Sequence, residues 1–287
     1  MSSNPIQWYP GHMAKARRMM QENLGMVDVL CEILDARIPH ASRNPDLNAL
    51  AAGKPRIIVL GRADLADPKQ TAAWKKHYEK QGFPVLVCDS RSGKETAAFN
   101  SIVRTLLADR IRLWNEKGQQ GRKIRLMTVG IPNVGKSTFI NTLAGRKAAI
   151  ACDRPGVTRG KQWIGVNAGM ELLDTPGVLW PKFDDPEVGR LLAVTNAIRA
   201  EVLDREELAA DFLRRLCCLY PEAIRQRYKI EPDAEKSGYT LLEEAARKRG
   251  LLISGGEPDM ERMANTLLTE YHSGKLGRLT LEEAPGE

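Results

Sequence analysis

The segment "IRLMTVGIPNVGKSTFINTLAG", residues 124–145, joins an apolar run, a glycine-containing loop and a helical pattern. Its middle, residues 130–137, fits the G-x-x-x-x-G-K-[ST] pattern of a phosphate-binding loop, or P-loop. In such a loop successive backbone N–H groups surround phosphate oxygens, and the glycines allow the tight path. Because the motif requires this order of strand, loop and helix, the segment predicts an α/β nucleotide-binding domain.

The P-loop and the first turn of the following helix supply most of the expected nucleotide contacts. These residues are Asn133, Val134, Gly135, Lys136, Ser137 and Thr138. Lys136 is expected to face the β- and γ-phosphate oxygens, and the Ser137 hydroxyl is expected to bind Mg²⁺.

Two segments after the P-loop have the pattern of nucleotide switches. "DTPG", residues 174–177, ends a short apolar run; Asp174 would hold Mg²⁺ through water and the Gly177 N–H would contact the γ-phosphate. Between the two motifs, "DRPGVTRG" supplies Thr158, the expected switch threonine that closes on Mg²⁺, although an ordinary surface loop is the alternative. Lys136, Thr158 and Gly177 are therefore predicted to act in catalysis.

The first part of the chain alternates apolar runs with segments of helical length. The candidate strands are 27–36, 56–60, 84–89, 124–130, 162–166 and 170–174. This alternation predicts a mostly parallel sheet with helices on both faces. After about residue 188 only amphipathic helical patterns remain, so we predict a nucleotide domain over 1–187 and a smaller all-helical domain over 188–287. The last residues, "EEAPGE", are expected to fray.

A second motif lies ahead of the P-loop. In "RIIVLGRADLAD", residues 56–67, the run Gly61-Arg62-Ala63-Asp64 is close to the Asn-Lys-x-Asp signature that reads guanine. The three strands before residue 90 resemble the last three strands of a small GTPase, which carry its fourth and fifth motifs. The order 4-5-1-2-3 is that of circularly permuted GTPases, and permutation preserves the sheet when the original termini are close.

Within that class the chain resembles one family along its whole length. The resemblance is carried by "IQWYPGHMAKARR", "DARIP", "SRNP", "GIPNVGKSTFIN", "DRPGVT", "LLDTPGVLWPKF" and a late "SGG". These segments resemble the YlqF/RbgA family, ribosome biogenesis GTPase A. The resemblance implies a GTPase that helps mature the large ribosomal subunit, with a helical C-terminal domain that contacts ribosomal RNA. Permuted relatives with zinc domains are disfavoured, because no Cys/His cluster has zinc-ligand spacing.

The chain departs from the family in the guanine-reading motif, where Gly61 replaces the usual asparagine. Asp64 can still accept hydrogen bonds from guanine N1 and N2, and Arg62 could cover the base as lysine normally does. Gly61 cannot make the asparagine contacts to the base edge and the P-loop, which could cost about 1–3 kcal/mol. We expect guanine preference to survive and affinity to fall. Ser90, in "DSRSG", would support the guanine O6 side.

Two further residues concern hydrolysis. Val178 follows "DTPG" where Ras-like enzymes have a water-orienting glutamine, so intrinsic hydrolysis should be slow. His12 in "PGHM" is the best candidate to complete the site, and the resemblance points to the same histidine; whether it positions the water or accepts its proton stays open. By similarity, Asn133 suggests a bound K⁺ that supplies the charge of an arginine finger; packing within the loop is the alternative.

The charge distribution separates the two parts of the chain. Up to Glu187 there are 28 Lys/Arg and 18 Asp/Glu, a balance of +10, whereas the remainder has 15 and 18, a balance of −3. The basic front part suits either a polyanion-facing side or a solvated surface. The five cysteines are expected to be reduced. The absence of a long apolar run predicts a cytoplasmic protein without a membrane partner. The free protein is expected to be a monomer.

These features lead to one functional hypothesis with two alternatives. The chain is predicted to bind GTP and GDP and to be a GTP-hydrolysing assembly factor for the large ribosomal subunit and its RNA. Mg²⁺ and K⁺ are its expected cofactors, and the bound particle would stimulate hydrolysis. A GTPase switch for another RNA or protein partner is one alternative. A weakly hydrolysing, nucleotide-dependent RNA-binding module is the other, suggested by Gly61 and Val178.

Overall fold

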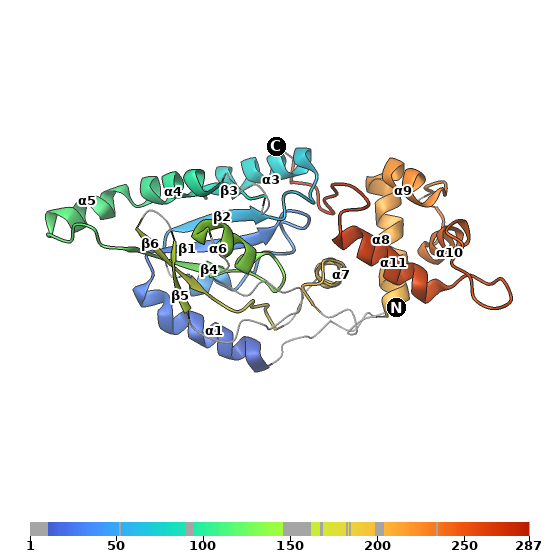
Figure 1. Ribbon diagram of the computed structural model, residues 1–287, viewed down its shortest axis with the longest axis horizontal. Helices are drawn as coiled ribbons and strands as arrows, with labels where there is room; N and C mark the ends of the chain where they lie inside the picture. The colour runs from blue at the N-terminus through green and yellow to red at the C-terminus, as the bar shows by residue number, and fades with distance from the viewer. Residues whose placement is uncertain are drawn as a thin grey trace. The chain divides into compact units, whose positions relative to one another are not determined.

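All six segments predicted as strands form strands of one sheet (Figure 1). The strands are β1 (Val29–Asp35), β2 (Arg56–Gly61), β3 (Val85–Val87), β4 (Ile124–Val129), β5 (Gln162–Val166) and β6 (Met170–Asp174). Their order in the sheet is β3-β2-β1-β4-β6-β5, and only the β5–β6 pair is antiparallel. The carboxyl ends of five parallel strands therefore meet at one edge, where ligands bind in such sheets.

The computed structural model of the chain describes most of its residues. These are 11–51, 53–89, 95–145, 162–166, 169–181, 183, 185–198, 204–233 and 235–286. The helices around the sheet are α1 (Gly11–Asn23), α2 (Leu47–Leu50), α3 (Pro68–Lys80), α4 (Glu95–Leu106), α5 (Ala108–Glu116) and α6 (Lys136–Ala144), with a 3₁₀ turn, η1 (Leu24–Met26).

Helices cover both faces of this sheet. All seven residues of β1 are buried, which requires apolar cover on both sides. Leu30 packs in a hydrophobic cluster with residues of α1, and Leu34 packs in a second cluster with residues of α3. Because residues four apart in a strand point to the same face, α1 and α3 cover one face. Helices α4 and α6 contact each other through Phe99 and Phe139, whose ring centroids are 5.3 Å apart.

The second part of the chain is helical, as its sequence predicts. Its helices are α7 (Pro186–Val194), α8 (Arg205–Leu219), α9 (Pro221–Tyr228), α10 (Gly238–Lys248) and α11 (Met260–His272). Helix α8 begins after Asp204, whose side chain accepts a hydrogen bond from the Glu207 N–H at 2.9 Å, as an N-cap does. Helix α9 starts with Pro221 in its first turn, a position that proline favours, so this residue separates α8 from α9.

The chain divides into two compact units that differ slightly from the predicted domains. The nucleotide unit comprises Gln7–Lys182 with Glu282–Glu287, and the helical unit contains Phe183–Leu281. The division therefore falls just before α7 rather than after Glu187. The prediction that the C-terminal end frays is wrong for Glu282 to Ala284, because the Trp74 Nε1 bonds the Glu282 carbonyl oxygen and Ala284 packs against the cluster that contains Trp74. An apolar contact with a helix so distant in sequence has no local signal.

Three of the cysteines in the described part of the chain are buried free thiols, namely Cys31, Cys88 and Cys217. Burial raises the pKa of Cys31 to about 12, so this thiol stays protonated at neutral pH. Cys218 is also free and is exposed. Among the described helices, none combines the length and the apolar character that crossing a membrane requires.

Candidate nucleotide-binding site

The P-loop follows β4 at the carboxyl edge of the sheet and leads directly into α6. Gly135, immediately before the helix, has φ of +99°, a conformation that side-chain-bearing residues rarely adopt. At Gly130 a Cβ atom would lie 2.5 Å from the Ile33 carbonyl oxygen, so the backbone approaches β1 too closely for any side chain. The two glycines of the motif are thus needed for two different reasons.

Lys136, the motif lysine, folds back over the loop. Its Nζ donates hydrogen bonds to the carbonyl oxygens of Gly130 at 3.2 Å and Ile131 at 2.6 Å. The residue is 7% exposed, and this burial lowers the pKa of Lys136 to about 8, although the nearby Asp174 carboxylate favours the charged form. The ammonium group is thereby held at the loop that would receive phosphate oxygens.

Asp174 ends β6 and is buried beside the P-loop. Burial raises the pKa of Asp174, while the charge of Lys136 and the Thr175 backbone act in the opposite direction. Within the described part of the protein, the Asp174 Oδ1 atom is buried without a hydrogen-bond partner. A buried oxygen of this kind is costly unless a cation or donor satisfies it. The Asp174 carboxylate and Ser137, at the start of α6, offer oxygen ligands of the kind that Mg²⁺ binds.

The DTPG turn lies directly on the P-loop. The Thr175 hydroxyl donates to the Thr128 carbonyl oxygen at 2.5 Å, which fastens the turn to β4. A Cβ atom at Gly177 would lie 2.6 Å from the Pro132 Cα, so only glycine fits there. The Val178 N–H donates to the Gly130 carbonyl oxygen at 3.1 Å, and this valine is 3% exposed. An apolar, buried side chain at this position cannot orient a water molecule.

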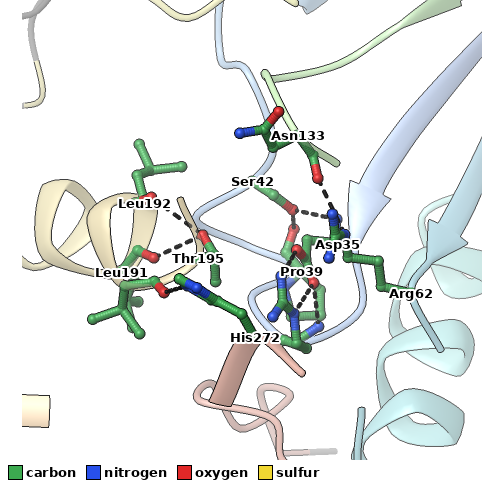
Figure 2. Close-up of polar contacts among 11 residues, drawn as sticks. Asp35, Pro39, Ser42, Arg62, Asn133, Leu191, Leu192, Thr195 and His272 are labelled. Atoms are coloured by element: carbon green, nitrogen blue, oxygen red, sulfur yellow. Dashed lines mark hydrogen bonds and ion pairs between the residues drawn. The ribbon is translucent and has the colours of Figure 1, made fainter. Parts of the chain in front are cut away.

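The base-reading loop meets the P-loop through the backbone and through one arginine. A Cβ atom at Gly61 would lie 3.0 Å from the Val134 carbonyl oxygen, so the end of β2 nearly touches the P-loop. Arg62 adopts φ of +54°, and its Nε donates to the Asn133 carbonyl oxygen at 3.1 Å (Figure 2). Arg62 thus provides a side-chain link from the base-reading loop to the P-loop, next to the position of Gly61. Asp64 follows, half-buried, in the same loop.

A buried ion pair supports the neighbouring end of β1. The Arg37 guanidinium, fully buried, donates to both carboxylate oxygens of Asp35 at 2.9 and 2.7 Å. Burial favours a raised pKa for Asp35, but the charges of Arg37 and Arg62 and the hydrogen bonds from Arg37 lower the pKa overall. The Asp35 N–H donates to the Ser42 hydroxyl at 3.0 Å (Figure 2). Reasoning from sequence did not single out this pair, which belongs to the "DARIP" segment.

Some predicted site residues lie outside the described part of the chain. These are Ser90, Thr158 and the side chain of His12. The backbone of His12 is described and belongs to the first turn of α1. Ala16 and Met20 of the same helix share one hydrophobic cluster with Val178, so α1 packs in the region of the switch turn.

The basic residues of the helical unit are largely paired within that unit. Arg225 forms ion pairs with two glutamates, and Arg227 pairs with the buried Glu270. Arg247 pairs with Glu243 at 3.0 Å. The positive charge of these arginines is thus partly neutralised by carboxylates.

The order in which the chain builds the sheet defines the class of protein. Strand β2, whose end carries the base-reading loop, precedes β4 and β6, whose ends carry the P-loop and the DTPG turn. A P-loop GTPase with its motifs in this order is circularly permuted, and this chain has that fold. A family model described as "50S ribosome-binding GTPase" matches residues 125–224, beginning in β4.

Proteins of known family match the chain over nearly all its length. It is 44% identical to Ribosome biogenesis GTPase A of Priestia megaterium over 97% of this chain and 96% of that protein. It is 31% identical to Ribosome biogenesis GTPase A of Thermotoga maritima over 96% of this chain and 94% of that protein. The chain therefore belongs to the ribosome biogenesis GTPase A family. It binds guanine nucleotide, hydrolyses GTP and functions in ribosome biogenesis.

Solved structures agree with this assignment. The chain superposes on GNP-bound YlqF from T. maritima with a TM-score of 0.65 and 29% identity, covering 95% of this chain and 100% of that one. A structure described as GDP-bound TM YlqF gives a TM-score of 0.66 and 28% identity, with coverage of 93% and 99%.

Proposed function

We propose that this GTPase acts on the large ribosomal subunit and that the bound particle stimulates its hydrolysis. The proposal rests on Val178, an apolar, buried residue whose N–H donates a hydrogen bond to the P-loop. With no water-orienting side chain at this position, efficient hydrolysis requires a group brought in from elsewhere. The matching family model, described as 50S ribosome-binding GTPase, and the basic charge of the first 187 residues support the large subunit as partner.

The geometry of the P-loop and the base-reading loop supports a specific assignment of the nucleotide contacts. We assign the phosphates to the P-loop backbone, Lys136 and the Gly177 N–H, and the base to Asp64 with Ser90. Arg62 would cover the base with its aliphatic stem while its Nε holds the P-loop. The remaining residues proposed to line the nucleotide are Asn133, Val134, Gly135, Ser137 and Thr138.

The ligands that we assign to Mg²⁺ are Ser137, Thr158 and Asp174. When bound, the ion supplies positive charge to the β- and γ-phosphate oxygens. The buried Oδ1 of Asp174 supports this assignment, because it is the kind of oxygen that a cation shell satisfies. The Asn133 side chain is our proposed ligand for K⁺, which would add charge where other GTPases use an arginine finger.

His12 is the group that we propose completes the catalytic site. Its helix, α1, shares a hydrophobic cluster with Val178, which supports a location near the switch turn. We propose that the free protein is a monomer and that its docking on the particle brings His12 over the nucleotide. His12 would then position the attacking water or accept its proton.

The helical unit is proposed to contact ribosomal RNA. Because Arg225, Arg227 and Arg247 are engaged in ion pairs, an RNA phosphate would have to displace carboxylates from them. Lys248 and Lys275, which are exposed, are better placed for phosphate contacts.

The test is GTP hydrolysis in K⁺ buffer with and without purified large ribosomal subunits. ATP in place of GTP, Na⁺ in place of K⁺ and the small subunit in place of the large one are the controls. We expect the large subunit to stimulate turnover, and expect Na⁺ or His12→Ala to abolish that stimulation. GTP binding without stimulation by the large subunit would overturn the proposal and favour a nucleotide-dependent binding module.

A further inference from the structure

The C-terminal segment returns to the nucleotide unit and is held there by specific bonds. The Trp74 Nε1 donates to the Glu282 carbonyl oxygen at 3.1 Å, and the Ala284 N–H donates to the Gln70 Oε1 at 3.3 Å. Ala284 also packs against the apolar cluster between α3 and the sheet. The segment therefore has a defined position on α3, although it is short and carries two adjacent glutamates.

The first of these glutamates binds the loop that follows β1. The Glu282 carboxylate accepts hydrogen bonds from the backbone N–H groups of His40 at 2.7 Å and Ala41 at 2.9 Å. Two successive N–H groups directed at one carboxylate form an anion-binding turn. We refer to residues 36–46 as the β1 loop. Glu283, the next residue, is exposed and provides a matched comparison of equal charge.

The β1 loop is stiffened by its own bonds. The Arg43 N–H donates to the His40 carbonyl oxygen at 3.0 Å, and the Ser42 N–H donates to the Ile38 carbonyl oxygen at 2.9 Å. Its base is fixed by the buried pair of Asp35 and Arg37. These bonds join His40 and Ala41 to the rest of the loop.

The far end of the β1 loop contacts the residue after the DTPG turn and helix α1. The Asn44 Nδ2 donates to the Val178 carbonyl oxygen at 3.3 Å, directly after the DTPG turn. Asp46 forms an ion pair at 3.2 Å with Arg17 of α1, the helix that contains His12. One loop thus connects Glu282 to the switch turn and to α1.

We propose that Glu282 is a positioning residue for GTP hydrolysis. By fixing the β1 loop, its carboxylate sets the position of the Val178 carbonyl and of α1, and hence of the groups that must align on the attacking water. The helical unit is inserted between residues 182 and 282, so the chain attaches it to the nucleotide unit just after the switch turn and again at Glu282.

The test compares steady-state GTP hydrolysis of the full-length Glu282→Ala and Glu283→Ala variants. We expect Glu282→Ala to lower kcat by about tenfold with KM and GDP affinity unchanged, since small misplacements of catalytic groups have effects of this order. Glu283→Ala removes the same charge without touching the β1 loop and should retain the wild-type kcat. Glu282→Gln, which keeps one acceptor oxygen, should recover part of the loss.

Two further measurements separate positioning from a general loss of structure. Asn44→Ala cuts the same connection at its other end, so its effect on kcat should not add to that of Glu282→Ala. Hydrogen–deuterium exchange should increase in residues 38–46 and 176–181 of Glu282→Ala and stay unchanged in α8 to α11. The proposal would be overturned if Glu282→Ala kept the wild-type kcat or if Glu283→Ala lost as much kcat as Glu282→Ala. It would also be overturned if the effects of Glu282→Ala and Asn44→Ala on kcat were additive.

Discussion

Arg62 links the base-reading loop to the P-loop beside a position that has no side chain. Gly61 leaves no side chain to link the base-reading loop with the P-loop, and its Cα region lies against the Val134 carbonyl. Arg62 supplies the link by donating its Nε to the Asn133 carbonyl oxygen. The left-handed backbone of Arg62, with φ of +54°, is part of the arrangement that aims this side chain.

Truncation of Arg62 should therefore weaken nucleotide binding. We expect Arg62→Ala to raise the Kd for GDP about tenfold, because one hydrogen bond that orders the P-loop is worth about 1.4 kcal/mol. Arg62→Lys retains a donor and should lose less. Isothermal titration with GDP measures both, and wild-type affinity in Arg62→Ala would show that the bond has no role in binding.

Gly177 is constrained by sterics in the described conformation. We expect Gly177→Ala to lower the free energy of unfolding by about 1–3 kcal/mol, because its Cβ would lie 2.6 Å from the Pro132 Cα. GTP hydrolysis should fall as well, since the turn and the P-loop must separate. Gly165→Ala in β5 is the control, because no atom lies within 4 Å of the added Cβ. Equal urea denaturation midpoints for the two variants would contradict the steric argument.

At the scale of elements, the sheet and the helical unit are stabilised differently. In the sheet, β1 is buried along its whole length and is held by packing on both faces. In the helical unit, a polar cluster links three helices through Glu270 of α11. This carboxylate accepts hydrogen bonds from Arg227 Nε at 2.9 Å, Tyr228 Oη at 2.9 Å and Arg249 Nη2 at 3.3 Å.

This cluster predicts an acid-sensitive helical unit. The hydrogen bonds from Arg227 lower the pKa of Glu270 below its value of 4.5 in the unfolded chain, although burial acts against them. Because the folded state favours the ionised carboxylate, this contribution is complete above about pH 4.5 and is lost as the pH falls through the lowered value.

Glu270→Gln tests that prediction. At pH 7 the substitution should lower the unfolding free energy of the helical unit by about 2 kcal/mol, since one partner of a largely buried ion pair is removed. The difference from wild type should shrink as the pH falls below 4. Hydrogen exchange of the α11 amides across a urea series measures this difference in unfolding free energy. The control is Glu261→Gln, at an exposed position of the same helix. A difference that persists unchanged at low pH would exclude ionisation as its source.

At the scale of the whole molecule, the helical unit is an insertion into the nucleotide unit. The buried residues of its helices include Leu213, Leu216, Leu242 and Leu267, which give it a core of its own. The nucleotide unit, in contrast, takes its last residues from the far side of that insertion. When the chain is divided, the helical unit should therefore still fold, whereas the nucleotide unit should lose stability.

A fragment spanning residues 183–281 should fold alone. We expect a helical far-UV circular dichroism spectrum and a cooperative urea transition, because its core is supplied from within. The complementary fragment 1–182 lacks Glu282 and Ala284, so it should unfold at lower urea than the nucleotide unit of the full chain. A non-cooperative transition in the fragment 183–281 would show that its core is insufficient.

The sequence by itself determined the six strands, the P-loop and the permuted motif order. Each of these depends on contiguous signals: apolar runs of strand length, or a motif whose spacing fixes the backbone path. Only the tertiary structure decided the contacts between distant segments. The Arg62–Asn133 bond spans 71 positions and the Glu282–His40 bond spans 242, and neither has a local pattern. The same reason explains why the C-terminal segment was expected to fray, since its anchors on α3 and the β1 loop meet it only after the chain has folded.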